Sequence, residues 1–187
     1  ILVSNPAVYD GVPLFHSVHK NLLKTGTGVT QEAMQTMIMA LANQEDQFGE
    51  AIIINPAKLV VPSGMQFDMY TLFNSPTIHT TDNTQAVNPL FQYRDRLEVV
   101  EDPVINALCG GMGNVMPWWL LGAAGDTEFI EVDYLNGQEI PNIRRMETPG
   151  QLGFVWDIYL DWGISVMDFR GGIKNPGVEV KTKLELA

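Results

Sequence analysis

The stretch QEAMQTMIMALANQE, residues 31–45, carries the clearest helical pattern in the chain. Apolar side chains recur in it at the i, i+3, i+4, i+7 spacing of one helix face. These residues are Met34, Met37, Ile38 and Leu41. Thr30 stands just before them as a candidate N-cap. The sequence therefore predicts a helix over residues 31–45 whose apolar face packs into a core, the alternative being an adaptable methionine-rich binding face.

Short apolar runs and turn signals follow this helix. The runs AIII, residues 51–54, and LVV, residues 59–61, are each ended by a proline-containing break and predict buried strands. Residues 65–73 predict a second helix, and the polar residues 74–89 predict a long loop. The segment RLEVVEDP, residues 96–103, predicts a strand, and residues 104–108 predict a helical turn.

The second half of the chain predicts sheet, because its apolar or alternating runs are separated by Gly, Asn and Asp. The runs are PWWLLGA (117–123), EFIEVDYLNG (128–137), FVWDIYLDWG (154–163) and ISVMDFRGG (164–172). Asn136-Gly137 predicts a hairpin turn. In the third run, alternation places Asp157 and Asp161 on an exposed face, opposite apolar side chains. The fold class expected is α+β, with about two early helices and then a mainly antiparallel sheet.

Bulk properties exclude several classes of protein. The chain has 187 residues, a net charge of −11 and one cysteine, Cys109, so an intramolecular disulfide framework is excluded. Neither a membrane-spanning run of about 18 apolar residues nor a signal peptide pattern occurs. The chain also begins without Met, which predicts a fragment or a processed product.

Charge is unevenly distributed along the chain. Residues 98–168 hold 12 acids against Arg144 and Arg145, a balance of −10. Residues 170–183 have a balance of +3, from Arg170, Lys174, Lys181 and Lys183 against Glu179. The acidic middle argues against a nucleic-acid groove there. The basic segment is interpreted either as a contact for polyanions or an acidic neighbour, or as a solvated edge.

Two histidines in LFHSVHKNLL, residues 14–23, are the candidate metal ligands. A metal-dependent hydrolase could use His16 and His19 together with His79 or an acid. His-x-x-His needs a helix to align the two rings, and Pro13 and the following glycines leave little helix there. The other interpretation is a polar turn whose side chains satisfy backbone groups.

Further candidates for chemistry have simpler structural interpretations. The glycine-rich residues 109–113 lack the Lys-Ser/Thr ending of a phosphate loop and predict a connection. Asp157 and Asp161 could act as an acid–base pair, but their spacing favours an exposed sheet face. Trp118 and Trp119 are expected to pack in the core or an interface. We therefore predict no catalytic, cofactor-binding or metal-binding residues, no cofactor and no enzyme activity.

Four signatures, in order, resemble the major capsid proteins of tailed bacteriophages, particularly the Mu-like prophage major head subunit family. The first is PLFHSVHKN (13–21), and the second is the helix QEAMQTMIMA (31–40) that leads to INPAKLVVPSGMQFDMYTLFNS (54–75). The third is NPLFQYRDRLEVVEDP (88–103) followed by MPWWLLGAAGDTEFIEVDYLNGQEIPNI (116–143). The fourth is VWDIYLDWGISVMDFRGGIKNPG (155–177). The resemblance covers roughly residues 12–177. Where the family has His-Gly-Asn, this chain has His19-Lys20-Asn21.

The resemblance implies the Hong Kong 97 type of capsid fold, truncated at the N-terminus. Residues 1–50 would be a peripheral-domain segment with part of the spine helix, residues 51–150 the axial domain, and residues 151–187 the strands that return to the peripheral domain. Phe15, His16, His19 and Asn21 would be a structural signature that ties a loop to its neighbours.

The function implied by the resemblance is that of a structural protein. The chain would be a major head subunit that self-assembles as pentamers and hexamers into an icosahedral shell. Its partners would be further copies of itself, a scaffold protein and a portal protein, with packaged DNA enclosed without sequence-specific binding and no membrane partner. It would be made in the bacterial host cytoplasm and reside in the virion. Another phage structural component, such as a tail or decoration protein, is a further alternative.

Overall fold

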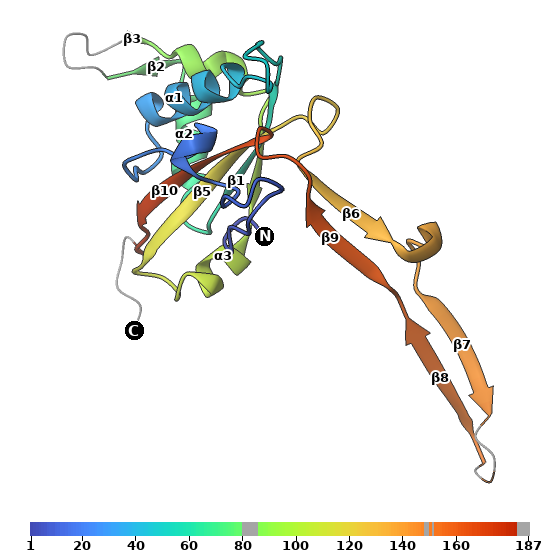
Figure 1. Cartoon of the computed structure of the whole chain (residues 1–187). Helices are drawn as coiled ribbons and strands as arrows, with labels where there is room; N and C mark the ends of the chain where they lie inside the picture. The colour runs from blue at the N-terminus through green and yellow to red at the C-terminus, as the bar shows by residue number, and fades with distance from the viewer. Residues whose placement is uncertain (80–85, 148–149, 151, 183–187) are drawn as a thin grey trace.

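The computed structural model describes residues 1–79, 86–147, 150 and 152–182. A four-stranded sheet carries helices on one face, and a long two-stranded ribbon leads away from this body (Figure 1). The mixed helix and strand content agrees with the predicted α+β class. None of the helices in these described ranges has the length and apolar content needed to cross a membrane.

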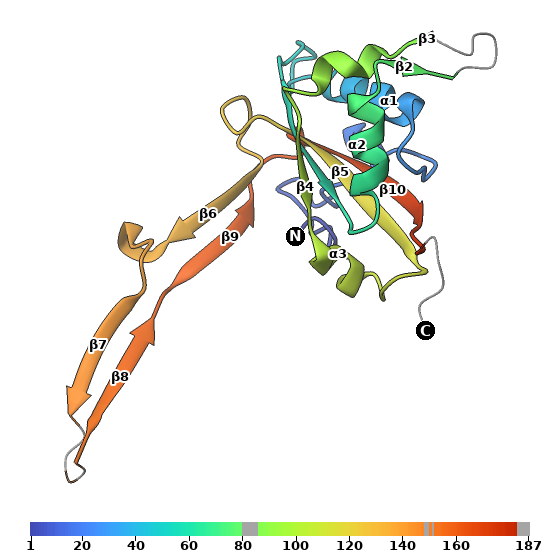
Figure 2. The same ribbon diagram turned by 180° about the vertical axis from the view of Figure 1, so that it is seen from behind.

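The sheet has the strand order β10-β5-β1-β4. Its strands are β1 (Pro56–Val61), β4 (Glu98–Glu101), β5 (Val115–Gly122) and β10 (Gly172–Glu179). β5 runs antiparallel to both β1 and β10, whereas β1 and β4 are parallel. The strands predicted in LVV, in RLEVVEDP and in PWWLLGA are thus confirmed. β4 forms one edge of the sheet (Figure 2).

Two helices cover one face of the sheet. They are α1 (Gln31–Ala42) and α2 (Gln66–Asn74), and both were expected from the sequence. Thr30 caps α1, because its hydroxyl oxygen accepts a hydrogen bond from the Ala33 N–H at 3.2 Å. The apolar face of α1 is buried, which confirms the core interpretation of its methionines.

The loop after α1 departs from two predictions. The helix ends at Ala42 rather than at residue 45, and AIII is no regular strand. The Asp46 carboxylate accepts hydrogen bonds from the N–H groups of Phe48 and Glu50, at 2.8 and 2.9 Å. These bonds turn the chain back on itself, so Ala51 makes only an isolated bridge to Glu45.

The other sheet face is covered by the N-terminal segment. Alternation along β5 sends Trp118 into the core under the helices and Trp119 into a second cluster with Leu14 and Phe15. Both tryptophan side chains are fully buried. The prediction that they pack in the core is confirmed, with one on each face.

The remaining elements are short. α3 (Pro103–Leu108) confirms the predicted helical turn, and its first turn is capped by the Asp102 side chain. The 3-10 helices are η1 (Ser17–His19), η2 (Pro89–Tyr93) and η3 (Leu135–Gly137). The predicted loop over residues 74–89 contains a small strand pair, β2 (Thr77–Ile78) with β3 (Ala86–Val87). Residues 80–85 of that loop lie outside the described residues.

The ribbon consists of two strand pairs placed end to end. β6 (Ile130–Tyr134) pairs with β9 (Trp162–Val166), and β7 (Asn142–Glu147) pairs with β8 (Phe154–Tyr159). The hairpin predicted at Asn136-Gly137 is therefore wrong. Asn136, at φ 57°, belongs to η3, which joins two strands on the same side of the ribbon. Asn136 and Gly137, at φ 57° and 70°, form a turn that is closed by a hydrogen bond from the Gln138 N–H to the Leu135 carbonyl oxygen at 3.3 Å. The strands on either side of this turn pair with β9 and β8 and not with each other.

A bulge in β10 is held by Asn175 and Gly177. The Asn175 side-chain oxygen accepts hydrogen bonds from the N–H groups of Thr27 and Gly177, at 3.0 and 2.8 Å. Gly177 has φ +77°, and a Cβ at this position would overlap the carbonyl oxygen of Met116. The Lys-Asn-Pro-Gly sequence of residues 174–177 thus has a structural explanation: only glycine fits the close approach of β5 to the bulge.

Candidate functional site: a projecting ribbon and the network at its base

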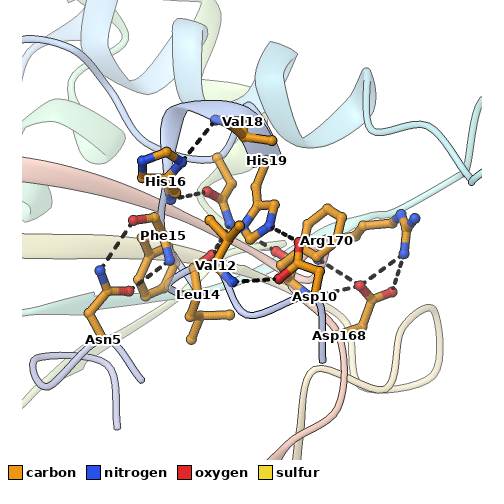
Figure 3. A network of polar contacts seen from close by, with 12 residues as sticks. Asn5, Asp10, Val12, Leu14, Phe15, His16, Val18, His19, Asp168 and Arg170 are labelled. Atoms are coloured by element: carbon orange, nitrogen blue, oxygen red, sulfur yellow. Dashed lines mark hydrogen bonds and ion pairs between the residues drawn. The ribbon is translucent and has the colours of Figure 1, made fainter. Parts of the chain in front are cut away.

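A polar network lies where the ribbon joins the body (Figure 3). His19 is buried, and both of its ring nitrogens have partners within the chain. Nδ1 lies 3.1 Å from the Leu14 carbonyl oxygen, and Nε2 lies 2.8 Å from Oδ2 of Asp10. The hydrogen bond from His19, with a second from the Val12 N–H, lowers the pKa of Asp10 below its ordinary value.

Asn21 connects this network to the returning strand of the ribbon. Its side-chain amide donates to the carbonyl oxygens of Leu14 and Phe169, at 2.7 and 3.0 Å. Its side-chain oxygen accepts from the His16 N–H at 3.0 Å. The His19 ring also stacks on the Phe169 ring, so residues 14–21 hold the segment between β9 and β10 from two sides.

Asp168 and Arg170 complete the attachment. The Arg170 Nη1 donates to both carboxylate oxygens of Asp168, at 2.9 and 3.0 Å, and its Nε donates to the Glu45 carbonyl oxygen at 2.8 Å. The side chain of Arg170 is only 15% exposed. Asp168 and Arg170 therefore fix the chain as it leaves the ribbon, and they tie it to the loop after α1.

The predicted structural signature of residues 15–21 is confirmed by these contacts. His16 accepts a hydrogen bond from the Val18 N–H through its Nδ1 at 3.3 Å, which closes the turn of η1. Lys20 has φ 55°, a left-handed conformation that glycine adopts without strain. That conformation gives a physical reason for a glycine between the histidine and asparagine of the family pattern.

The alternative of a metal-dependent hydrolase gains no support from this geometry. The rings of His16 and His19 lie 6.5 Å apart, and both nitrogens of His19 are already engaged. His79 is exposed and follows β2. Within the part of the chain that the structure describes, no three His, Cys, Asp or Glu side chains are grouped so that they could hold a metal ion.

Two residues of the basic segment, Arg170 and Lys174, are partly buried and engaged within the chain. Arg170 pairs with Asp168 as described above. Lys174 extends over the rings of Phe15 and Trp119, its Nζ 5.8 and 6.0 Å from their centroids. Burial lowers the pKa of Lys174 below its ordinary value. Neither side chain is therefore a free surface charge.

The other basic residues of the segment differ from this pair. Lys181 is exposed and pairs with Glu179 at 2.9 Å. Lys183 lies outside the described residues.

The inner half of the ribbon, β6 with β9, is amphipathic. Cross-strand pairing puts apolar side chains on one face and Glu131 and Asp133, opposite Ser165 and Gly163, on the other. The apolar face consists of Ile130, Val132, Tyr134, Trp162, Ile164 and Val166. Alternate residues of β6 thus point to opposite sides of the ribbon, as strand geometry requires.

The outer half of the ribbon, β7 with β8, is exposed on both faces. Asp157 is exposed and lies on the face opposite Phe154, Trp156 and Ile158, as predicted. The apolar face is uncovered as well, because the outer ribbon projects beyond the sheet (Figures 1 and 2). Trp156 is 62% exposed and Ile158 is 64% exposed. Asp157 faces Arg144 across the ribbon, and Asp161 lies in the short gap between β8 and β9.

The base of the ribbon is nevertheless anchored in the core. Phe129 and Val166 pack against the cluster around Trp119, and the Phe129 and Phe15 rings lie 6.3 Å apart. The base of the ribbon is thus packed against the core, whereas its outer part is uncovered. The sequence analysis did not predict this uncovered surface. The signal in the sequence was that the two strands carry apolar residues on both faces, with no core to cover them.

A family model described as a phage capsid protein matches residues 1–175, which is most of the chain. The chain therefore belongs to this family of phage capsid proteins, and the predicted capsid resemblance is confirmed. A search of curated proteins found no match. Family membership gives the chain a structural role in the capsid, a place in multimeric shells and a location in the virion.

Proposed function

We propose that this protein is a major head subunit that self-assembles, through its ribbon, into the icosahedral shell of a tailed phage or prophage. The exposed apolar surface of the ribbon carries the proposal. A two-stranded hairpin alone is at best marginally stable in water, and three or more strands or a packed face are needed for independent stability. The outer ribbon therefore requires a covering surface, and further copies of the chain supply one in a shell.

The distribution of packed and uncovered parts supports this function. The body has a buried core on both sides of its sheet, whereas the ribbon residues Trp156, Ile158 and Ile143 are largely exposed. Exposed apolar patches of this kind mark interaction sites in proteins. A body with a packed core and an uncovered arm suits a subunit that is completed by its neighbours.

The finer assignments belong to the same proposal. The fold would be of the Hong Kong 97 type, with α1 as part of the spine helix and with residues 1–50, 51–150 and 151–187 as peripheral, axial and returning segments. The subunit would be of the Mu-like kind, form pentamers and hexamers, and work with scaffold and portal proteins around packaged DNA. It would be made in the bacterial host cytoplasm and perform no enzymatic reaction.

Electron microscopy and sedimentation of the protein, alone and with its natural scaffold protein, test the proposal. Closed particles of uniform diameter are expected. Tubes or small rings would instead favour a tail or decoration component. A product that stays monomeric with its scaffold protein would contradict the proposal.

A further inference from the structure

A groove of about 720 Å³ runs between α2 and the edge strand β4. Its floor and walls are largely apolar, with Phe67, Tyr70, Phe73, Leu97 and Val99 among the lining residues. Phe67 is 66% exposed and Tyr70 is 71% exposed. Two large aromatic side chains thus stand uncovered beside an open sheet edge.

The edge itself offers a second means of attachment. β4 is parallel to β1 on one side, and it is the last strand of the sheet. An edge strand presents backbone N–H and C=O groups that can pair with an added strand. A strand added next to β4 would place alternate side chains on the α2 side, in the groove.

We propose that the groove between α2 and β4 receives strand β8 of a second copy of the chain. This inference rests on the proposed self-assembly and names its contact surface. In β8, the side chains of Phe154, Trp156 and Ile158 share one face, by strand alternation. Inserted beside β4, that face fills the apolar groove while the β8 backbone extends the sheet across the two copies.

Charge favours the same pairing. The groove lining carries the carboxylates Asp95 and Glu101, and Asp95 is already paired with Arg94 at 3.1 Å. Glu101 accepts a hydrogen bond from the Ser63 hydroxyl and is exposed. On the ribbon, Arg145 lies opposite Trp156 on the same face, with its guanidinium 3.4 Å from the Phe154 ring centroid and its Nη2 3.8 Å from Glu147. This pair with Glu147 is exposed, and docking replaces it with a pair to Glu101. Docking brings the Arg145 guanidinium to Glu101, and opposite charges across an interface fix its register.

The position of the two surfaces makes the contact directional. Both views show the outer ribbon far from α2 and β4 of its own chain (Figures 1 and 2). Ribbon and groove are different surfaces, so the contact is heterologous: each copy gives its ribbon to one neighbour and takes a ribbon from another. Heterologous contacts close into rings when the rotation allows it.

Site-directed cross-linking in assembled particles tests this inference. Tyr70→Cys and Ile158→Cys are introduced together in a Cys109→Ala background, and a short bismaleimide is added. A ladder of covalent dimers, trimers and larger species is expected from the double variant, and no ladder from either single variant. Ser165→Cys with Tyr70→Cys is the matched control, because Ser165 lies on the acidic ribbon face, and it should give no ladder.

Three results would overturn the inference. Dimers from Ile158→Cys alone would show that ribbons pack on ribbons. Particles that form normally without any cross-link between positions 70 and 158 would place the ribbon elsewhere and leave self-assembly intact. Wild-type protein that forms no particles would remove the proposed function, and the inference with it.

A charge exchange gives an independent readout. Arg145→Glu and Glu101→Arg are each expected to reduce particle yield at least tenfold, and the combined variant is expected to recover most of it. Each single variant is checked for a wild-type circular dichroism spectrum. Equal yields from the two single variants and the combined variant would contradict the pairing of these residues.

Discussion

The rings of His19 and Phe169 stack 3.9 Å apart with their planes inclined by only 7°. These residues are 150 positions apart in the sequence, one in the N-terminal turn and the other just after the ribbon. The stack and the hydrogen bonds around it determine where the ribbon leaves the body. The outer part of the ribbon can contact a neighbouring copy at a defined place only if the base of the ribbon is held in a fixed position.

The side chain of Asn21 is expected to be the most sensitive part of the base of the ribbon. Asn21→Ala removes three hydrogen bonds, and it leaves buried backbone groups of Leu14 and Phe169 without these partners. We expect the free energy of unfolding to fall by roughly 2–4 kcal/mol, measured by urea denaturation. Asn74→Ala is the control, because the hydrogen bond that the described part of the structure gives to the Asn74 side chain goes to the Tyr70 carbonyl oxygen of its own exposed helix end. Equal losses in the two variants would contradict the role assigned to Asn21.

Asp10 should make part of the stability depend on pH. Its pKa is lowered by hydrogen bonds from His19 and the Val12 N–H, so its stabilising effect is present above the ordinary value of 3.8 and is lost as the pH falls below it. Asp10→Asn should lower the melting temperature near neutral pH, and the difference from wild type should shrink as the pH approaches about 3. Thermal melts across this range measure it. A difference that stays constant down to that pH would refute the effect.

Gly177→Ala tests the bulge in β10. The left-handed backbone and the overlap with Met116 both oppose a Cβ at this position. We expect a loss of at least about 3 kcal/mol in the free energy of unfolding. Gly125→Ala is the control, because a Cβ there would have no heavy atom within 4 Å, and it should change the free energy by less than about 0.5 kcal/mol. A mild effect at Gly177 would show that β5 and the bulge can separate.

Lys174 is expected to cost stability at neutral pH. Burial lowers its pKa, which means that the folded protein disfavours the charge, and this cost is relieved as the pH rises toward 10.5. Lys174→Met keeps the long apolar stem and should raise the melting temperature by about 1–3 °C. Lys58→Met, at an exposed residue, should have a smaller effect. A lower melting temperature for Lys174→Met would mean that the contacts with the Phe15 and Trp119 rings outweigh the burial of charge.

Local patterns predicted the helices and the sheet of the body well. Helix α1 has a clear apolar repeat and a threonine cap, and β5 has an unbroken apolar run, so short-range sequence was sufficient for both. The end of α1 was missed because the Asp46 side chain redirects the chain, a contact outside the repeat. The hairpin that Asn136-Gly137 predicts does not form, because two residues at positive φ specify a tight turn but not which strands pair on either side of it.

The candidate site was predictable only in part. The hydrogen-bonding role of His19 and Asn21 followed from their residue types, whereas their partner Phe169 lies almost at the other end of the chain. Alternation in residues 154–163 predicts Asp157 on the face opposite the apolar side chains, which is confirmed, and the usual rule is that the apolar face of such a strand is buried. That rule assumes a covering layer, and a projecting ribbon has none within its own chain. Arg170 and Lys174 were assigned to the surface because charge along the sequence does not reveal burial.

The most direct test of the ribbon's role is the assembly state of a variant with a polar ribbon face. Ile143→Ser, Trp156→Ser and Ile158→Ser are combined, and Val18→Ser, Phe48→Ser and Ile53→Ser form the control, because all six side chains are exposed in the single chain. We expect the ribbon variant to melt within about 3 °C of wild type but to sediment as a monomer, while the control still forms particles. Particles of normal size and yield from the ribbon variant would contradict the account.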